Sequence, residues 1–131
     1  MIYLLDLNYT LVANSDKKVH PFTEQIRQEQ YRPELVARLA GSTVFLLTAR
    51  PARHEAQTIE SITAKTGWTP SRWFFNTHNL PPPSAKRKMM VDTILPENPG
   101  ETFLAIESNP RTRAMFKSIG VDAMPFDKFL I

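Results

Sequence analysis

Short hydrophobic runs are separated by longer segments with helical periodicity along most of this chain. Continuous apolar stretches span residues 2–7, 43–47, 72–75 and 102–106, and a shorter one covers residues 122–124. Runs of this length without alternation are typical of strands that are buried on both faces, as in a parallel sheet. The sequence therefore predicts five strands at these positions.

Helix signals occupy the segments between these strands. Proline opens each of three helices, over residues 33–40, 51–65 and 110–120, and a glycine lies at or just after the end of each. Ser84 is expected to cap a further helix over residues 85–95. The alternation predicts an α/β fold with a doubly wound parallel sheet, in which ligands bind beyond the carboxyl ends of the strands.

The length of 131 residues suits a single domain over residues 1–131. The least regular segment, residues 12–32, is expected to be a small flap over the carboxyl edge of the sheet. Residues 80–84 contain three consecutive prolines and are expected to form a stiff connector.

Composition narrows the kind of protein. There is no cysteine, so thiolate metal sites and a cysteine nucleophile are excluded, and any metal must be held by oxygen or imidazole. No apolar run approaches the roughly 18 residues of a membrane span, and Asp6 comes too early for a signal peptide, so we expect a cytoplasmic protein. The net charge of +3 is small, but eleven of 16 cations lie from Arg50 onward, which indicates a weakly basic rim near the strand ends.

Polar residues with related chemistry follow the predicted strands. Asp6 ends the first strand, Thr48 and Arg50 follow the second, and Glu107 follows the fourth. Lys86-Arg87-Lys88 stands in the helix before the fourth strand. Two acids for a hard cation, with a hydroxyl and cations for phosphate, are the groups that phosphoryl chemistry uses.

These motifs resemble the haloacid dehalogenase (HAD) superfamily and, within it, the phosphatase domain of polynucleotide kinase/phosphatases. The resemblance covers almost the whole chain and is carried by the following segments: Asp6-Leu-Asn8-Tyr-Thr10, Thr48-Ala-Arg50, Lys86 or Lys88, and residues 104–121 with Glu107-Ser108. It implies a three-layer α/β/α Rossmannoid (HAD-like) fold with a parallel sheet and no large cap domain. It also implies a phosphorylated small molecule, nucleotide or nucleic-acid end as the partner.

The resemblance implies a role for each site residue. Asp6 would be the catalytic nucleophile that forms an aspartyl-phosphate, next to Asn8. The cofactor would be Mg²⁺, held by Asp6, the main-chain carbonyl of Asn8, and Glu107. Thr48, Arg50 and Lys86 would bind phosphate. Lys86 is favoured over Lys88, because Lys86 shares a helix face with residues 90 and 94 and so points to the sheet, whereas Lys88 shares a face with Asp92.

Two positions depart from the family pattern. Asn8 replaces the aspartate that protonates the leaving group and activates water, and Ser108 replaces an acid after Glu107. The leading hypothesis is a Mg²⁺-dependent HAD phosphatase for a nucleotide or polynucleotide (3′-)phosphate, weakened by Asn8. The alternatives are an impaired HAD-fold module that only binds such phosphates, and a phosphohydrolase for low-pKa leaving groups.

Less specific interpretations of the same residues stay open. Thr48 and Arg50 could be ordinary capping residues, and Glu107 could cap the following helix. Trp68, Trp73 and residues 74–75 are expected to pack in the core or at an edge, since base stacking needs exposed rings beside cations. Exposed apolar residues at 126–131 could serve a purely structural or partner-binding protein. The sequence leaves the oligomeric state open.

Overall fold

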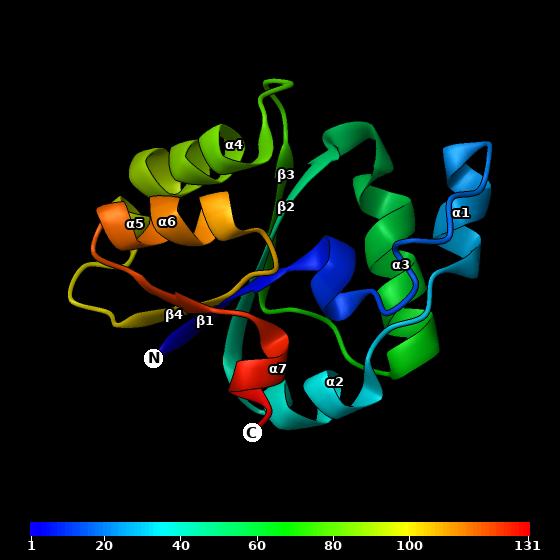
Figure 1. Cartoon of the computed structure of the whole chain (residues 1–131), viewed down its shortest axis with the longest axis horizontal. Coiled ribbons are helices and arrows are strands. Elements are labelled where there is room, and N and C mark those ends of the chain that lie inside the picture. The colour runs from blue at the N-terminus through cyan, green and yellow to red at the C-terminus, as the bar shows by residue number, and fades with distance from the viewer.

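Five parallel strands form the centre of the computed structural model, which describes residues 1–131 (Figure 1). The strands are β1 (Ile2–Asp6), β2 (Thr43–Pro51), β3 (Arg72–Asn76), β4 (Phe103–Ile106) and β5 (Asp122–Met124), in the order β3-β2-β1-β4-β5. In this register Asp6 pairs with Leu47, and Leu5 pairs with Ile106. The strand order reverses at β1, so the carboxyl end of β1 is the expected place for a ligand.

Helices cover both faces of the sheet and make the three predicted layers. One core combines alternate strand residues such as Leu5 and Leu46 with α2 (Pro33–Leu39), α3 (Glu55–Thr66) and α7 (Phe126–Phe129). The other combines Leu4 and Phe45 with the π-helical segment η3 (Met90–Ile94) and α6 (Pro110–Ser118). Neighbouring strand residues thus supply opposite cores, as the pleat requires. The prediction of an α/β/α parallel-sheet fold is confirmed.

Strand β2 is longer than its hydrophobic run predicted. It continues through Thr48 and Arg50 to Pro51, and the helix predicted from Pro51 begins instead as the 3₁₀ turn η2 (Ala52–His54) before α3. Gly67, with φ 71°, ends α3 in the left-handed conformation that glycine favours. Thr48 and Arg50 therefore belong to a strand and do not cap a helix.

The prolines after β3 begin a helix, which corrects the predicted connector. Helix α4 (Pro82–Met89) has proline in its first turn, where no amide hydrogen is needed, and Ser84 makes no capping hydrogen bond. The helix continues through η3 and α5 (Leu95–Glu97), two residues beyond the predicted end. Lys86 accordingly lies inside a helix, one turn after its start.

The segment over residues 12–32 contains α1 (Phe22–Gln28) and lies against α3 (Figure 1). Val12 forms an isolated antiparallel bridge with Tyr31, and Lys65 donates hydrogen bonds to the carbonyl oxygens of Arg27 and Glu29 at 2.6 and 2.7 Å. The bridge joins the two ends of the segment to each other, and Lys65 ties its C-terminal part to α3. The action of this segment as a flap stays a prediction.

The C-terminal residues are partly packed, so the suggested apolar surface there is wrong in part. Phe129 is buried and meets Tyr3 edge to face, and Phe126 lies under the guanidinium of Arg32. Ile131 is exposed. None of the helices has both the length and the apolar character that crossing a membrane requires.

Candidate phosphate site at the end of strand β1

Asp6 is the buried carboxylate at the carboxyl end of β1. Its Oδ1 accepts a hydrogen bond from Lys86 Nζ at 2.7 Å, and its Oδ2 accepts from Thr10 Oγ1 at 2.7 Å and Ser108 Oγ at 2.9 Å. Burial alone would raise the pKa of Asp6, but the charge of Lys86 and the hydrogen bonds from Lys86 and Thr10 lower the pKa below its ordinary value. Asp6 is therefore an ionised, oriented carboxylate.

Lys86 joins the two acids that the sequence placed at adjacent strand ends. Its ammonium lies 2.6 Å from Glu107 Oε1, and Glu107 Oε2 accepts a hydrogen bond from the amide of Asn109 at 3.1 Å. Burial would lower the pKa of Lys86, but the negative charges of Asp6 and Glu107 raise it. Burial, reinforced by the charge of Asp6, raises the pKa of Glu107 to about 7 against the attraction of Lys86.

Lys86 and Lys88 lie on different faces of their helix, and Lys86 is the one that faces the sheet, as the helix-face argument predicted. Lys86 is buried, whereas Lys88 is exposed and pairs with Asp92 at 2.6 Å, one turn further along the helix. A helix rotates by about 100° per residue, so two residues of separation carry these lysines to different faces. The role of Lys86 toward phosphate stays a prediction.

Arg50 makes a buried ion pair that sequence reasoning did not anticipate. Its Nη1 donates to Glu29 Oε1 at 3.0 Å and to Thr58 Oγ1 at 3.0 Å, while its Nη2 donates to Glu29 Oε2. Thr48, also buried, accepts a hydrogen bond from the Arg50 amide at 3.1 Å. Both terminal nitrogens of Arg50 are thus engaged inside the protein, and phosphate binding by Thr48 and Arg50 stays a prediction.

The same guanidinium fixes the orientation of the Asn8 side chain. Asn8 Oδ1 accepts a hydrogen bond from Arg50 Nη2 at 3.0 Å. Because a guanidinium can only donate, the amide oxygen must face Arg50 and the Nδ2 donors must point away from it. Asn8 is exposed. At this position the chain therefore presents an exposed amide donor.

The oxygens around Ser108 test whether a hard cation fits. Ser108 Oγ lies 2.9 Å from Asp6 Oδ2 and 3.4 Å from the main-chain oxygen of Asn8, so these two oxygens converge on one place. This donor chemistry fits Mg²⁺, which is often held by one or two carboxylates and otherwise by water and phosphate oxygens. Glu107 is turned to Lys86, and no group of three His, Cys, Asp or Glu side chains is placed to hold a metal.

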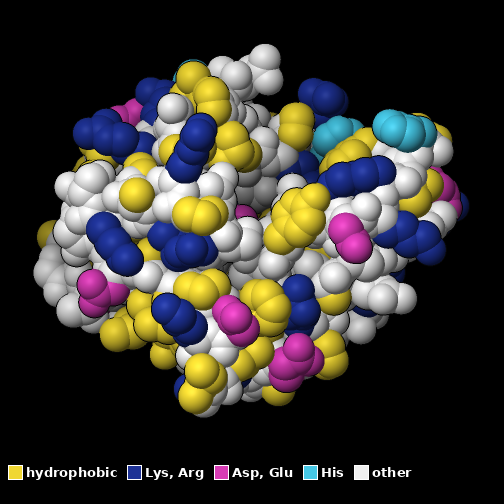
Figure 2. Space-filling model, viewed as in Figure 1, with side chains coloured by type: hydrophobic (Ala, Val, Ile, Leu, Met, Phe, Trp, Pro, Cys, Tyr) yellow, Lys and Arg dark blue, Asp and Glu magenta, His cyan; other side chains and the backbone are white.

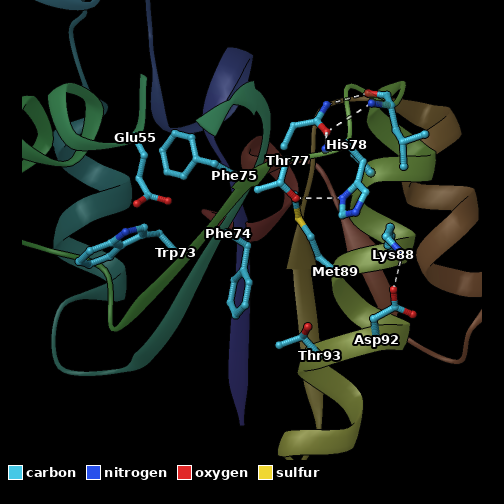
Figure 3. A pocket seen from close by; sticks show the side chains of 13 residues that line it. Glu55, Trp73, Phe74, Phe75, Thr77, His78, Lys88, Met89, Asp92 and Thr93 are labelled. Carbon is cyan, nitrogen blue, oxygen red and sulfur yellow. Dashed lines mark hydrogen bonds and ion pairs between the residues drawn. The ribbon is translucent and has the colours of Figure 1, made fainter. Parts of the chain in front are cut away.

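A separate cavity of about 300 Å³ follows the outer strand β3 and helix α4 (Figure 3). Trp73 and Phe74 line it together with Lys88, whose pair with Asp92 is drawn in the figure. Phe75 is buried, Phe74 is half-buried and Trp73 is exposed, so the expectation of core or edge packing holds best for Phe75. Neither Asp6 nor Thr48 lines this cavity.

The positive charge expected around the strand ends is partly used inside the molecule. Arg50 and Lys86 are buried in ion pairs, and Arg113 donates to the carbonyl oxygens of Glu107 and Ser108 at 3.0 and 2.8 Å. On the face of the molecule that Figure 2 shows, the visible Lys and Arg side chains are spread among acidic and hydrophobic ones. Arg53 lines a second, polar cavity with Pro51 and Asn76, beyond the ends of β2 and β3.

Comparisons with known proteins show a shared fold. No family model matches this chain, and no curated protein matches it. Among solved structures, it is similar to a chain of the Pnkp1/Rnl/Hen1 RNA repair complex, with a TM-score of 0.75 and 16% identity over 95% of this chain and 41% of that chain. It is also similar to a chain of a second structure of the Pnkp1/Rnl/Hen1 complex, with a TM-score of 0.75 and 14% identity over 95% of this chain and 45% of that chain. The protein thus spans less than half the length of these structural neighbours.

Proposed function

We propose that this chain is a Mg²⁺-dependent phosphatase of the haloacid dehalogenase type, acting on the (3′-)phosphate of a nucleotide or nucleic-acid end. The observation that carries the proposal is the ionised carboxylate of Asp6, held by Lys86 where the strand order reverses. The fold shared with chains of an RNA repair complex supports the choice of a nucleic-acid end as substrate.

The proposed reaction has two displacements at phosphorus. An oxygen of Asp6 forms a bond to phosphorus while the ester P–O bond breaks, which gives an aspartyl-phosphate and an alkoxide that must gain a proton. Water then attacks phosphorus, loses a proton, releases phosphate and regenerates the Asp6 carboxylate. Mg²⁺ held by Asp6 and the Asn8 carbonyl, and by Glu107 if its carboxylate turns from Lys86 to the ion, would offset the charge of the phosphoryl oxygens. Thr48 and Lys86 would also bind these oxygens.

Asn8 limits this reaction at the proton transfers. Its amide can donate a hydrogen bond to a leaving oxygen but cannot give up a proton, and general acid/base groups are typically worth about 10²–10⁴-fold. Alkyl phosphates should therefore react slowly, and phosphates with acidic leaving groups should react faster. The contact of Asn8 with Arg50 favours a second candidate, a module that binds such phosphates without hydrolysing them.

An assay of two substrates tests the proposal. Wild type, Asp6→Asn and Asn8→Asp are given an aryl phosphate or a 3′-phosphorylated oligonucleotide, each with and without Mg²⁺. We expect wild type to hydrolyse phosphate in a Mg²⁺-dependent reaction that Asp6→Asn abolishes. Asn8→Asp should raise the rate of hydrolysis, and more for the oligonucleotide than for the aryl phosphate. Arg50 would keep the new carboxylate charged, so the gain should lie near the lower end of about 10²–10⁴-fold.

The possible outcomes separate the candidates. Phosphate binding without turnover in wild type and Asn8→Asp would reject the phosphatase and support the binding module. Turnover that survives Asp6→Asn would show that another group is the nucleophile. Absence of both binding and turnover would reject both functions.

A further inference from the structure

Tyr9 combines a strained backbone with an exposed ring beside the candidate phosphate site. In the irregular π-helical turn η1 (Leu7–Leu11), Tyr9 has φ 62° and ψ 4°, the left-handed conformation that a side chain disfavours. Its amide donates to the buried hydroxyl of Ser15 at 2.8 Å, which holds the turn. The strain lies one residue after Asn8 and three after Asp6.

Packing within the protein does not explain a tyrosine at this position. The side chain is 49% exposed, belongs to neither hydrophobic core and stacks on no other ring. Glycine would adopt the same backbone without strain. Strained residues of this kind cluster at sites that contact ligands, so the ring itself requires an explanation.

The surroundings of the Tyr9 ring suit a ligand that has both a flat aromatic part, which can stack on the ring, and a negative charge, which Lys18 can neutralise. Lys18 Nζ donates to the Tyr9 hydroxyl at 3.1 Å and lies 5.1 Å from the ring centroid. The ammonium is thus closer to the hydroxyl than to the ring centre, and lies at the hydroxyl end of the ring. Lys17, the preceding residue in the sequence, is also exposed. Bases of single-stranded nucleic acids stack on exposed aromatic rings in positively charged surroundings, and Tyr9 with Lys18 has both features.

We infer that Tyr9 and Lys18 form a subsite for the nucleobase of the nucleotide whose phosphate binds at Asp6. The inference rests on the proposed function, since it takes the phosphate site as the neighbouring anchor. The ring would stack on the base, and Lys18 would hold the ring and neutralise a backbone phosphate. The preferred substrate class is then a nucleotide or single-stranded end with an unstacked terminal base, not a phosphorylated sugar or metabolite.

Three ligands measured by calorimetry isolate the contribution of the base. They are adenosine 3′-methylenephosphonate, which resists hydrolysis, the same phosphonate on a ribose without a base, and inorganic phosphate. In wild type we expect the base to tighten binding by about 5- to 150-fold, the range for stacking on one aromatic side chain. Tyr9→Gly should remove this preference and leave inorganic phosphate binding unchanged, and Tyr9→Phe should keep it.

Two controls separate ligand contact from a structural role. Tyr9→Gly relieves the left-handed strain, so its melting temperature should not fall, whereas a tyrosine that merely fastened residues 12–32 through Lys18 would lower the melting temperature when removed. Lys18→Met and Lys17→Met change the net charge equally, and only Lys18→Met also removes the contact with Tyr9. We expect the larger loss of phosphonate nucleotide affinity in Lys18→Met.

Equal binding of the two phosphonates by wild type, or an unchanged base preference in Tyr9→Gly, would overturn the subsite. Failure of inorganic phosphate to bind, with a nucleotide still bound through Tyr9, would instead count against the proposed phosphate site and leave the subsite standing. Failure of all three ligands to bind would overturn both.

Discussion

At the scale of single residues, the ammonium of Lys86 decides whether two buried acids can coexist. Lys86→Met would leave Asp6 and Glu107 without their cation, and removing one partner of a buried ion pair typically costs about 3–5 kcal/mol. Lys88→Met removes an exposed pair with Asp92, worth about 0–1 kcal/mol. We expect urea unfolding to show a large loss only for Lys86→Met, and phosphate titration to show the same selectivity. Equal losses of phosphate affinity would indicate a diffuse basic field.

The pKa of Glu107 predicts how the stability of the metal-free protein depends on pH. Folding raises this pKa from 4.5 to about 7, so the folded state holds a proton that the unfolded state has lost. This stabilisation is complete below pH 4.5, falls as the pH rises from 4.5 to 7, and is lost above the folded-state pKa of about 7, a decrease of about 3 kcal/mol for a shift of this size. Asp6, whose pKa is lowered, contributes in the opposite direction but below this window.

Urea unfolding at several pH values between 4.5 and 8 measures this loss, with Glu107→Gln as the matched variant. The lowered pKa of His54 makes stability rise with pH in part of the same window, but His54 is present in both proteins and cancels in the difference. Wild type should lose stability relative to Glu107→Gln as the pH rises. Parallel curves for the two proteins would show that Glu107 does not titrate there.

The sequence predicted which side chains meet at the site better than it predicted their partners. Asp6 and Glu107 lie at the ends of neighbouring strands, and Lys86 faces the sheet. The order of the strands and the helix face on which Lys86 lies were therefore enough to predict that these three side chains meet. The pair between Arg50 and Glu29 joins residues 21 positions apart, in an irregular segment where no periodicity indicates which side chain points inward. Tyr9 was missed because a left-handed backbone at a tyrosine leaves no sequence signal.

At the scale of elements, the buried ion pair between Arg50 and Glu29 holds the end of α1 against strand β2. Glu29→Gln would leave Arg50 with an uncompensated charge, and we expect a loss of about 3–5 kcal/mol in the free energy of unfolding. Glu24→Gln, within α1, removes a solvent-exposed pair with Arg27 and should change stability by less than about 1 kcal/mol. Hydrogen exchange over residues 12–32 should accelerate only in Glu29→Gln. Similar, small effects in both variants would show that the pair does not hold the segment.

The predicted element boundaries differ from the structure where one local sequence pattern is compatible with two conformations. Three consecutive prolines fit a stiff extended connector, yet two of them also fit the first turn of a helix, and packing of Ala85 and Lys86 against the sheet decides for the helix. The polar residues after Leu47 favour a strand end, yet pairing of Pro51 with Asn76 on β3 prolongs β2. Both choices depend on tertiary contacts that lie outside any short window of sequence.

At the scale of the whole molecule, the fold separates two kinds of cation. The buried ones, Arg50 and Lys86, are neutralised by acids inside the protein, so a net charge of +3 says little about the surface that a ligand meets. Arg53 is exposed beyond the carboxyl ends of β2 and β3, whereas Arg38 is exposed near the end of α2, at the opposite edge of the sheet (Figure 1). These two arginines therefore offer a test of where a nucleic-acid strand runs.

Arg53→Gln and Arg38→Gln change the net charge equally, so any difference between them reports position. If a single-stranded nucleic acid leaves the phosphate site across the carboxyl ends of the β-strands, Arg53 neutralises one of its phosphates. Arg53→Gln should then reduce the slope of log K against log salt concentration for oligonucleotide binding by about 0.7. Arg38→Gln should leave the slope unchanged, because Arg38 lies on the side of the sheet away from the carboxyl ends of the strands and packs over the ring of Phe129. Equal changes in both variants would mean that long-range charge attracts the strand without a defined path.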